Sequence, residues 1–458
     1  MAEIIVTNRK TAILGMGVTG MSVAAFLSSR GMLFDFADSR AEPPNLDRVK
    51  KDYPDVKLAL GSFDKDFLMG FDRLIVSPGI ALDEPALVAA REQGVELLGD
   101  LELFLEHAEA PVIIITGSNG KSTVTALLGQ MAKDSGLSVG VGGNIGTPML
   151  DLLNNNHQLY VLEVSSFQLE LLNDSRGAVA GLLNISPDHL DRYQNLQQYH
   201  AAKHRIFRGA SKVVINREDR LTRPLISTQI AMTSFGLNQP DLGSFGILEG
   251  LEEGYLAYGI ERLMLIDQVA LKGTHNIANA LAALALGYCV DLPMQVMLGT
   301  LKGFQGLPHR CQTVGNVDSA LYINDSKATN VGATVAAIEG FASKVHRNLI
   351  LIAGGQGKGQ DFSSLKQPVS EFVKLVVLFG EDGCKIESVL DGCCNSITAE
   401  SLELAVAEAH RLAAPGDVVL LSPACASFDM FTGFEHRGNC FQEAVCALGA
   451  ATAQGDSQ

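Results

Sequence analysis

The sequence predicts an α/β protein of three domains, each built on a mostly parallel sheet with crossover helices. Short apolar runs rich in Val, Ile and Leu alternate with helical patterns and Gly-containing turns along the whole chain. Such runs are typical of strands that are buried on both faces, as in parallel sheets. The length of 458 residues also corresponds to about three domains of roughly 150 residues each.

The expected strands fall into two series, one before and one after Arg310. They are residues 11–14, 73–76, 112–116, 160–164, 212–216, 321–325, 348–355, 374–380 and 417–423. Gly99 and the approach to Pro111 separate a first unit from a second, and GFQGLPHR at 303–310 is typical of a linker to a third. We therefore expect domains at 1–99, 100–306 and 307–458.

Composition narrows the classes of function. The 35 basic and 51 acidic residues leave a formal net charge of −16, so a broad attraction to nucleic acids or anionic lipids is not expected. The sequence contains no run of about 18 apolar residues, the length that would predict a membrane span. Its N-terminus lacks the pattern of a secretory signal. The eight cysteines fit neither a disulfide framework nor a zinc site. We expect a soluble, cytoplasmic protein with no nucleic-acid or membrane partner.

The first chemical motif is GMGVTG at 15–20, which follows an expected strand and opens a helical pattern, with Asp38 at the end of the next strand. Glycines at this spacing let the backbone approach a pyrophosphate held at a helix N-terminus. The layout predicts a Rossmann-like first domain. Taken alone, it leaves three interpretations open: a nicotinamide or flavin dehydrogenase, a protein that binds another nucleotide diphosphate, or a tight turn without a ligand.

The second motif is TGSNGKST at 116–123, a Gly-rich turn between an expected strand and a helix. In such a loop backbone amides cradle phosphates, Lys121 reaches the β and γ oxygens, and the Ser122 hydroxyl can hold Mg²⁺. The longer common pattern has Gly at position 115, where this chain has Ile, so the match is to a shorter form. We predict a central ATP-binding domain like those of P-loop ATPases. A separate ATP loop favours a ligase over a dehydrogenase.

Glu163 and His189 are candidate metal ligands in the central domain. Glu163 lies in the apolar run YVLEV, where an unpaired carboxylate would cost several kcal/mol of desolvation unless a cation compensates it. The alternative is a carboxylate that meets water at the end of the strand. His189 lies in SPDHLDRY, a turn before a helix, where a solvated histidine is the alternative.

Lys203 lies on a face that the helical pattern predicts to be buried. Leu196, Tyr199, Lys203 and Ile206 share one stripe at 3.6-residue spacing. The lysine could extend along that face to reach water. An amine held in a partly apolar site loses its proton more readily, which would also allow covalent modification.

The third domain contributes several polar segments that follow expected strands. They are LPHR at 307–310, INDSKATN at 323–330, GGQGKGQDF at 354–362 and SPACASFDMF at 422–431. Asp325, Lys327 and Lys358 lie in such turns, where ligand-contacting groups concentrate in parallel sheets. A solvated loop charge is the alternative for each of them.

The chain resembles the Mur ligases, ATP-dependent amide-forming enzymes of bacterial peptidoglycan synthesis. The resemblance runs in order through the full length, at residues 15–20, 77–80, 116–123, 142–146, 162–170, the Lys203 helix, 275–286, 307–310, 323–330 and 422–429. It is greatest to the member that adds D-glutamate to UDP-N-acetylmuramoyl-L-alanine. The D-N-P-R segment found in the diaminopimelate-adding relative is absent.

The resemblance implies that the first domain, Rossmann-like in fold, binds the UDP part of the substrate and not NAD. Ser39 stands where the family's Asp-Thr-Arg contact has Thr, and it keeps the hydroxyl. The substrate-binding residues implied on this side are Val18, Thr19, Asp38, Ser39, Arg40, Ser77, Gly79, Asn144 and His189.

The resemblance also implies the residues of the ATP and amino-acid sites. The implied ATP-binding residues are Gly117, Ser118, Asn119, Gly120, Lys121, Ser122, Thr123, Asn276, Asn279, Arg310 and Asp325. Lys121, Glu163, His189 and Lys203 are implied to be catalytic, and Ser122, Glu163, His189 and Lys203 to bind metal. The third domain, also Rossmann-like, would hold ATP or D-glutamate with Lys327, Thr329, Lys358, Ser427 and Phe434.

The implied reaction agrees with the chemistry of these residues. ATP would phosphorylate the L-alanine carboxylate, and the D-glutamate amine would then attack the acyl phosphate. Two Mg²⁺ ions, with Mn²⁺ as an alternative, and Lys121 would neutralise the charge on the transferring phosphoryl group. A carbamate on Lys203 would convert the buried cation into a metal ligand. We expect a monomer.

Two rival classes remain open from the sequence. An NAD-dependent dehydrogenase would account for residues 15–20 but not for the Lys121 loop. A nucleotide-regulated binding protein would account for the loop but not for Glu163, His189 and Lys203 together. Folate-polyglutamate ligases share the phosphate loop, but they would have no reason to keep a GMGVTG domain.

Overall fold

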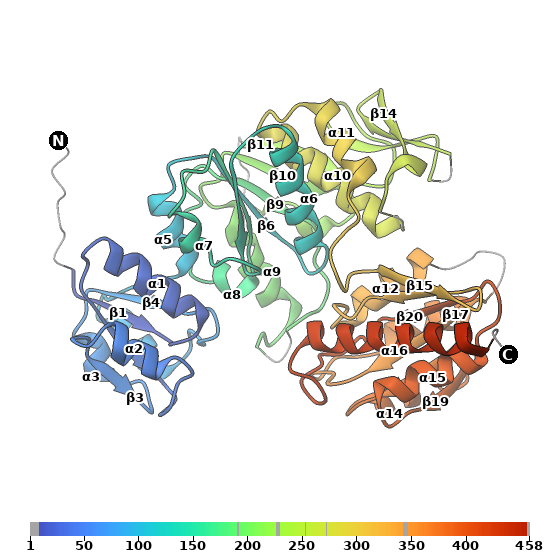
Figure 1. Ribbon diagram of the computed structural model, residues 1–458. Coiled ribbons are helices and arrows are strands. Elements are labelled where there is room, and N and C mark those ends of the chain that lie inside the picture. Colours follow the sequence, from blue (N-terminus) through green and yellow to red (C-terminus); the bar gives the residue numbers. More distant parts are fainter. Residues whose placement is uncertain are drawn as a thin grey trace.

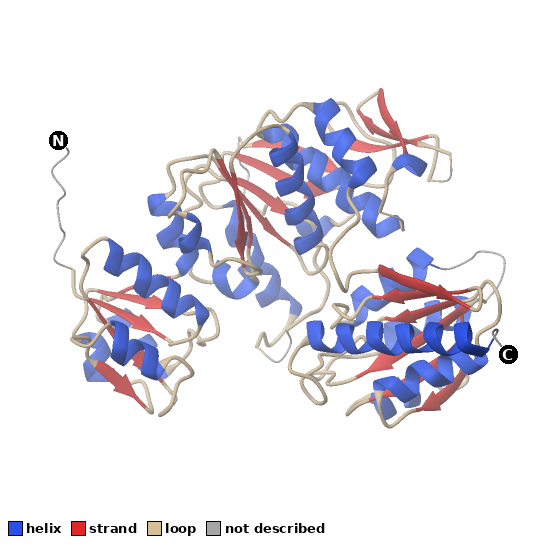
Figure 2. Ribbon diagram, viewed as in Figure 1, coloured by secondary structure: helices blue, strands red, loops and turns tan. Residues whose placement is uncertain are grey.

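A computed structural model describes residues 9–189, 192–225, 230–251, 253–271, 273–341 and 347–455. Its strands form three separate sheets, which follow one another along the chain from the blue end to the red end of Figure 1. Helices cover the sheets on both sides (Figure 2). The prediction of a three-domain α/β fold with mostly parallel sheets is confirmed. No helix in the described part of the chain is long and apolar enough to cross a membrane.

The first sheet is wholly parallel, with strand order β3-β2-β1-β4-β5. Its strands are β1 (Thr11–Leu14), β2 (Phe34–Asp38), β3 (Leu58–Leu60), β4 (Arg73–Val76) and β5 (Glu96–Leu98). Its helices are α1 (Val18–Ser29), α2 (Leu46–Asp52), α3 (Lys65–Met69) and α4 (Pro85–Glu92). Because the order reverses beside β1, the loops that follow β1 and β4 flank a crevice, where open α/β sheets bind ligands.

The second sheet has nine strands in the order β14-β13-β12-β11-β10-β9-β6-β8-β7. The strands are β6 (Val112–Thr116), β7 (Val139–Gly143), β8 (Leu159–Glu163), β9 (Val179–Leu182), β10 (Lys212–Asn216), β11 (Ala231–Phe235), β12 (Phe245–Leu248), β13 (Tyr255–Tyr258) and β14 (Glu261–Leu265). The helices are α5 (Asp100–His107), α6 (Lys121–Asp134), α7 (Met149–Leu152), α8 (Ser166–Leu169), α9 (Leu196–His204), α10 (Thr274–Cys289) and α11 (Met294–Gly303).

The far end of this sheet differs from the sequence prediction. Strands β12, β13 and β14 form an antiparallel meander, which the apolar-run pattern did not indicate. These strands lie at the edge of the sheet and have exposed or half-buried positions, so their sequences are not continuously apolar.

The third sheet has the order β15-β16-β20-β17-β18-β19, with only β15 antiparallel to its neighbour. Its strands are β15 (Gln312–Val317), β16 (Ala320–Asn324), β17 (Leu349–Gly354), β18 (Val373–Phe379), β19 (Asn395–Thr398) and β20 (Val418–Leu421). Its helices are α12 (Val331–Phe341), α13 (Lys366–Phe372), α14 (Gly383–Leu390), α15 (Leu402–Leu412) and α16 (Phe434–Gly455).

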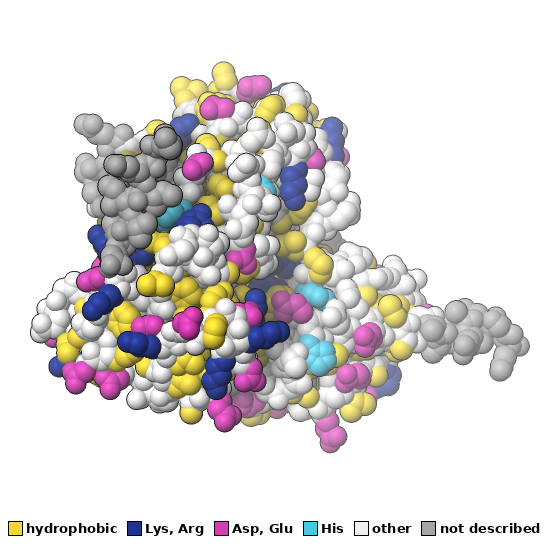
Figure 3. Space-filling model, turned by 60° about the vertical axis from the view of Figure 1, so that its left-hand side comes forward, with side chains coloured by type: hydrophobic (Ala, Val, Ile, Leu, Met, Phe, Trp, Pro, Cys, Tyr) yellow, Lys and Arg dark blue, Asp and Glu magenta, His cyan; other side chains and the backbone are white. Residues whose placement is uncertain are grey.

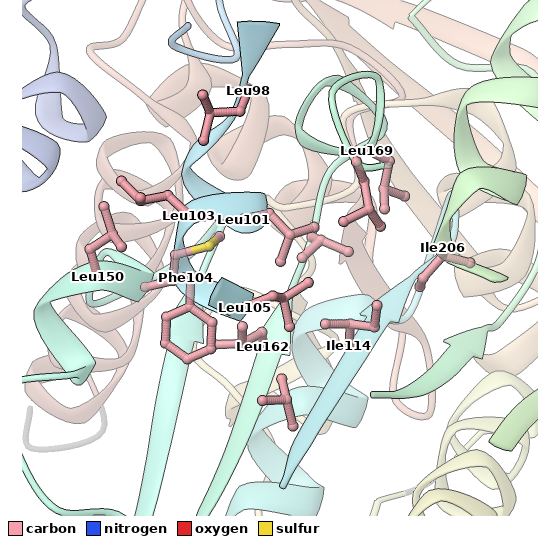
Figure 4. Close-up of a cluster of buried hydrophobic side chains, with 14 of the residues drawn as sticks. Leu98, Leu101, Leu103, Phe104, Leu105, Ile114, Leu150, Leu162, Leu169 and Ile206 are labelled. Atoms are coloured by element: carbon pink, nitrogen blue, oxygen red, sulfur yellow. The ribbon is translucent and has the colours of Figure 1, made fainter. Parts of the chain in front are cut away.

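The first two units share one hydrophobic cluster, whereas the third has its own. Leu98 from β5 and Leu101 and Phe104 from α5 pack in the same cluster as Ile114 and Leu162 from the second sheet (Figure 4). The hydroxyl of Ser22 also donates to Asp151 Oδ1 across this junction, at 2.7 Å. Separate clusters fill the two faces of the third sheet. The first two units therefore pack as one body.

Candidate functional site

The phosphate-loop motif adopts a tight turn between β6 and α6. Gly120 has φ 82°, and a Cβ atom there would lie 2.4 Å from Asn279 Oδ1, so only glycine fits. The amine of Lys121 donates to the carbonyls of Gly117 and Ser118, at 2.8 and 2.9 Å. Burial lowers the pKa of Lys121, and the carboxylates of Glu163 and Asp188 oppose that shift. The lysine thus lies directly over the loop that its motif predicts to bind phosphate.

Glu163 ends β8 beside this loop and is 1% exposed. Its Oε1 accepts a hydrogen bond from Asn144 Nδ2 at 2.9 Å, while Oε2 has no hydrogen-bond partner within the described residues. The burial that the sequence pattern predicts is therefore present, and water does not reach this carboxylate. A buried carboxylate oxygen without a donor favours a bound cation.

Lys203 lies on α9 and is 1% exposed. Its amine donates to Thr116 Oγ1 at 3.2 Å and to the Gly117 carbonyl at 2.9 Å, so it points at the phosphate loop and does not extend to water. Burial, together with the charge of Lys121, lowers the pKa of Lys203 well below its usual value. The amine is therefore easier to deprotonate than an exposed lysine.

His189 completes this side of the loop. It adopts φ 54°, and its ring lies edge-on to Phe167, with centroids 4.8 Å apart. Its Nε2 is 3.8 Å from Asp188 Oδ2. No cluster of three His, Cys, Asp or Glu side chains suited to a metal occurs among the described residues. The metal ligands that the family resemblance implies include only two residues of these types, Glu163 and His189. The other two implied ligands are Ser122 and Lys203.

A pocket of about 390 Å³ lies between the second and third units, next to the phosphate loop. The predicted residues that line it are Asn119, Gly120, Thr123, Asn276, Asn279, Arg310, Asp325 and Lys327. Arg310 Nη2 donates to the hydroxyl of Ser122, which brings the third unit onto the loop. Burial raises the pKa of Asp325 to about 6, although Ser422 donates to it. His275 and Cys311 also line this pocket, although no sequence pattern indicated either of them as a site residue.

The other residues of the third unit that were predicted to bind a substrate differ in burial and do not all lie at one place. The amine of Lys327 lies 3.7 Å from the centroid of the Phe434 ring, and burial lowers its pKa to about 8, with Arg310 adding to the shift. Ser427 is 2% exposed. Thr329 is half-buried and its carbonyl accepts from Gln360. Lys358 is exposed, with φ 51°, in the loop after β17.

A second pocket, of about 640 Å³, lies between the first and second units. Eight predicted residues line it: Val18, Thr19, Asp38, Ser39, Arg40, Ser77, Gly79 and Asn144. Asp38 Oδ2 accepts from the Met16 amide at 2.8 Å and from Arg40 at 2.7 Å. Burial acts to raise the pKa of Asp38, but the hydrogen bonds from Arg40 and Met16 hold it below its usual value.

Asp100 and Gln168 line this pocket as well, although neither was predicted from the sequence to be a site residue. Gln168 Nε2 donates to Asp100 Oδ2 at 2.9 Å, and its Oε1 accepts from the Ser165 amide at 3.0 Å. The second contact belongs to a capping box at the start of α8. Burial raises the pKa of Asp100. The acidic residue directly after Gly99, at a domain boundary, is the one sequence signal that could have pointed to this pair.

The phosphate loop thus lines the first pocket, next to a buried carboxylate and a buried lysine. The second pocket reaches Asn144, whose side-chain amide donates to that carboxylate, Glu163. This arrangement defines a nucleotide-dependent enzyme that brings two substrates together. Three family models match the chain in order: "Mur ligase MurD-like, N-terminal domain" at residues 9–99, "Mur ligase middle domain" at 115–287 and "Mur ligase, glutamate ligase domain" at 309–425. The chain belongs to the Mur ligase family.

Individual relatives agree with the family models. The chain is 52% identical, over 97% of its length and 100% of the relative, to the UDP-N-acetylmuramoylalanine–D-glutamate ligase of Pseudomonas savastanoi pv. phaseolicola. A pseudomurein peptide ligase type C from Methanothermus fervidus has the same fold, with a TM-score of 0.60 and 19% identity, covering 96% of this chain and 100% of that chain. UDP-N-acetylmuramate–alanine ligase from Thermotoga maritima also has this fold, with a TM-score of 0.57 and 20% identity. The match covers 96% of this chain and 99% of that chain.

Proposed function

We propose that this protein joins D-glutamate to UDP-N-acetylmuramoyl-L-alanine at the expense of ATP, in peptidoglycan precursor synthesis. The observation that carries the proposal is the 52% identity, over nearly the whole chain, to a ligase named for this reaction. The two separate pockets support it, because they provide one place for ATP, beside the phosphate loop, and another for the UDP-substrate, between the first and second units. The enzyme acts in the cytoplasm, where ATP is available, and as a monomer.

The first step activates a carboxylate, which is a poor acyl donor. The terminal L-alanine carboxylate attacks the γ-phosphorus of ATP, the bond to the β-γ bridging oxygen breaks, and ADP leaves with that electron pair. Lys121 neutralises negative charge on the transferring phosphoryl group, and the backbone amides of the loop bind the nucleotide phosphates. The pocket beside Asn276, Asn279, Arg310 and Asp325 receives the adenosine.

In the second step the D-glutamate amine attacks the acyl carbon. A tetrahedral intermediate forms and then collapses, inorganic phosphate leaves, and the amine loses a proton as the amide forms. Lys327, Thr329, Ser427, Phe434 and Lys358 bind the incoming amino acid. Because the site offers cationic and hydroxyl donors, an amino acid without a side-chain carboxylate would leave them unpaired.

Magnesium fits Ser122, Glu163 and His189, because Glu163 Oε2 is buried without a hydrogen-bond donor. When bound, Mg²⁺ ions lower the charge of the phosphate groups, and Mn²⁺ has similar ligand preferences.

Lys203 carries a carbamate in the active enzyme. The deprotonated form of its amine would attack the carbon of CO₂ and release one proton as the N–C bond forms. The resulting carbamate would replace a buried cation with a carboxylate-like ligand for the metal. The observation behind this proposal is the burial that lowers the pKa of this amine. Carbon-13 NMR with ¹³C-bicarbonate should show a carbamate signal in the wild type and none in Lys203→Arg. A spectrum without that signal in the active wild type would contradict the proposal.

We also retain the domain boundaries 1–99, 100–306 and 307–458 as a proposal for the functional units. The first unit binds the UDP-substrate, the second ATP, and the third the amino acid. Limited proteolysis should cut near 304–311, where the chain has no helix or strand between α11 and β15.

The test of the proposed function is initial-rate phosphate release with purified protein at saturating ATP. We expect turnover with UDP-N-acetylmuramoyl-L-alanine plus D-glutamate, and little with L-glutamate or D-alanine. Faster addition of L-alanine to the UDP-sugar that lacks the alanine would leave the family assignment in place and overturn the substrate assignment.

A further inference from the structure

The side chain of Arg192 connects the first unit with the second. Its Nη2 donates to the backbone carbonyl of Ile80, at 3.0 Å, in the first unit. The same nitrogen donates to Glu170 Oε2, at 2.8 Å, in the second unit. The side chains of Arg192 and Glu170 are 19% and 15% exposed, so this pair is screened by water much less than an exposed ion pair.

The Ile80 carbonyl belongs to the loop that closes the UDP pocket. Residues 77–80 all line that pocket, and the amide of Ile80 donates to the carbonyl of Ser77 at 3.0 Å, which forms a tight turn. The hydrogen bond from Arg192 therefore fixes the loop from the side of the second unit.

The backbone of Arg192 fixes His189. The amides of Arg192 and Tyr193 both donate to the carbonyl of His189, at 3.0 and 2.9 Å, and so hold the backbone of His189, which has φ 54°. Phe167 lies between the two side chains: its ring centroid is 5.0 Å from the Arg192 guanidinium carbon and 4.8 Å from the His189 ring centroid. One residue thus contacts both the UDP-sugar loop and the surroundings of a proposed metal ligand.

The contacts require an arginine. The flat guanidinium can lie against the Phe167 ring while one nitrogen donates to two acceptors in two units. A lysine would keep the charge and a hydrogen bond but would present no flat face to the ring.

We propose that Arg192 is a positioning residue that aligns the UDP-substrate, held in the first unit, with the phosphate loop of the second. The proposal rests on the proposed function and adds a residue that the family resemblance did not supply. Amide formation requires the L-alanine carboxylate to lie in line with the γ-phosphate, and an error of about 1 Å in such an alignment can cost about 100-fold in rate.

The experiment compares Arg192→Met, Arg192→Lys and Arg192→Ala with the wild type. For Arg192→Met we expect kcat/KM for the UDP-substrate to fall about 10- to 100-fold, while KM for ATP stays within about twofold. The Mg²⁺ concentration for half-maximal rate should also rise, because Phe167, which contacts the His189 ring, loses the guanidinium that packs on it. For Arg192→Lys, kcat/KM for the UDP-substrate should lie between the values of the wild type and Arg192→Met. Added guanidinium chloride, at concentrations below those that unfold the protein, should partly restore Arg192→Ala.

The matched control is Arg176→Met. Arg176 also pairs with a glutamate of the second unit, Glu106, at 2.9 Å, but it lines neither pocket. Its kinetic constants should stay within about twofold of the wild type, as expected for an exposed pair.

Three outcomes would overturn the inference: unchanged kinetics in folded Arg192→Met, equal changes in the ATP and UDP-substrate constants, or a loss that guanidinium does not restore at all. Failure of the proposed function would look different, because the wild type itself would then release no phosphate with D-glutamate. In that case the inference about Arg192 can still be tested by measuring the binding of UDP-N-acetylmuramoyl-L-alanine by calorimetry. Weaker binding to Arg192→Met than to Arg176→Met would support the inference, and equal binding would overturn it.

Discussion

At the scale of single residues, burial was more predictable from the sequence than contacts. Glu163 and Lys203 could be identified because an apolar run and a helical stripe surround them, and both are buried. Asp100 had only its place after Gly99 as a signal, and Gln168 and Arg192 had none, because their contacts are with partners far away along the chain. Periodicity indicates which face is buried, but it does not indicate which segments meet.

Lys121→Ala tests the phosphate loop. Because this amine contacts the Gly117 and Ser118 carbonyls at the start of α6, its loss removes a charge that lies directly on the loop proposed to bind phosphate. We expect kcat to fall about 100-fold or more, with an unchanged circular dichroism spectrum. A folded variant with nearly normal turnover would refute the assignment of this loop.

Lys327 predicts a pH dependence of amino-acid binding. Its pKa is lowered to about 8, so the amine is charged below that pH and loses its charge as the pH rises through it. Binding of a dicarboxylate should therefore weaken above about pH 8. Glutarate, which has no amine to titrate, is the suitable competitive inhibitor. Its inhibition constant should rise with pH in the wild type and stay flat in Lys327→Arg, and a flat wild-type profile would contradict a binding role for this amine.

At the scale of elements, several strands near the site were predicted from the sequence, such as β6 and β8. The short strand β9, which lies between β10 and β6, was not predicted, and neither were the strands at the far edge of the central sheet. Strands β1, β6 and β8 are buried along their whole length and are mostly apolar, because helices pack on both faces of the sheet at these strands. Strands β11 and β14 have exposed residues, and β14 pairs on one side only, so their sequences carry a weaker pattern. The two pockets lie at the ends of buried strands, and many of the residues predicted from the sequence line them.

Gly20 is the element-scale test, because α1 packs directly on the turn after β1. A Cβ atom at Gly20 would lie 1.9 Å from the Gly15 carbonyl oxygen, whereas one at Gly17 meets nothing within 4 Å. Gly20→Ala should force the helix away from the turn and lower the free energy of unfolding by about 1–3 kcal/mol. Gly17→Ala should change it by less than about 0.5 kcal/mol. Urea denaturation checks both, and equal midpoints would contradict this account of the motif.

At the scale of the whole molecule, surface charge agrees with small-molecule substrates. Lys and Arg side chains are interspersed with Asp and Glu on the face shown in Figure 3, and the chain is acidic overall. Among its described residues, all eight cysteines are free, as expected for a chain without a disulfide framework. The relative placement of the three units, by contrast, could not be predicted, because it depends on contacts between surfaces that no local pattern encodes.

These contacts predict which unit moves. The first two units share a hydrophobic cluster, and separating them would expose apolar surface to water. The third meets the second through polar contacts of Arg310 with Ser122 and of Asn330 with Asn119 and Asp188, and through packing of α12 on α10. Polar interfaces of this kind exchange readily with water or ligand. The linker 304–311 includes Gly306, with φ 87°, and connects the two bodies.

We therefore expect the third unit to move as a rigid body when the substrates bind, while the first two stay together. Spin-label distances between the first and second units should be the same with and without ATP, UDP-substrate and D-glutamate. Distances between the second and third units should shorten or narrow when all three are present, and the radius of gyration from solution scattering should fall. Identical scattering profiles in the two states, or a changed distance between the first two units, would contradict this division of the molecule.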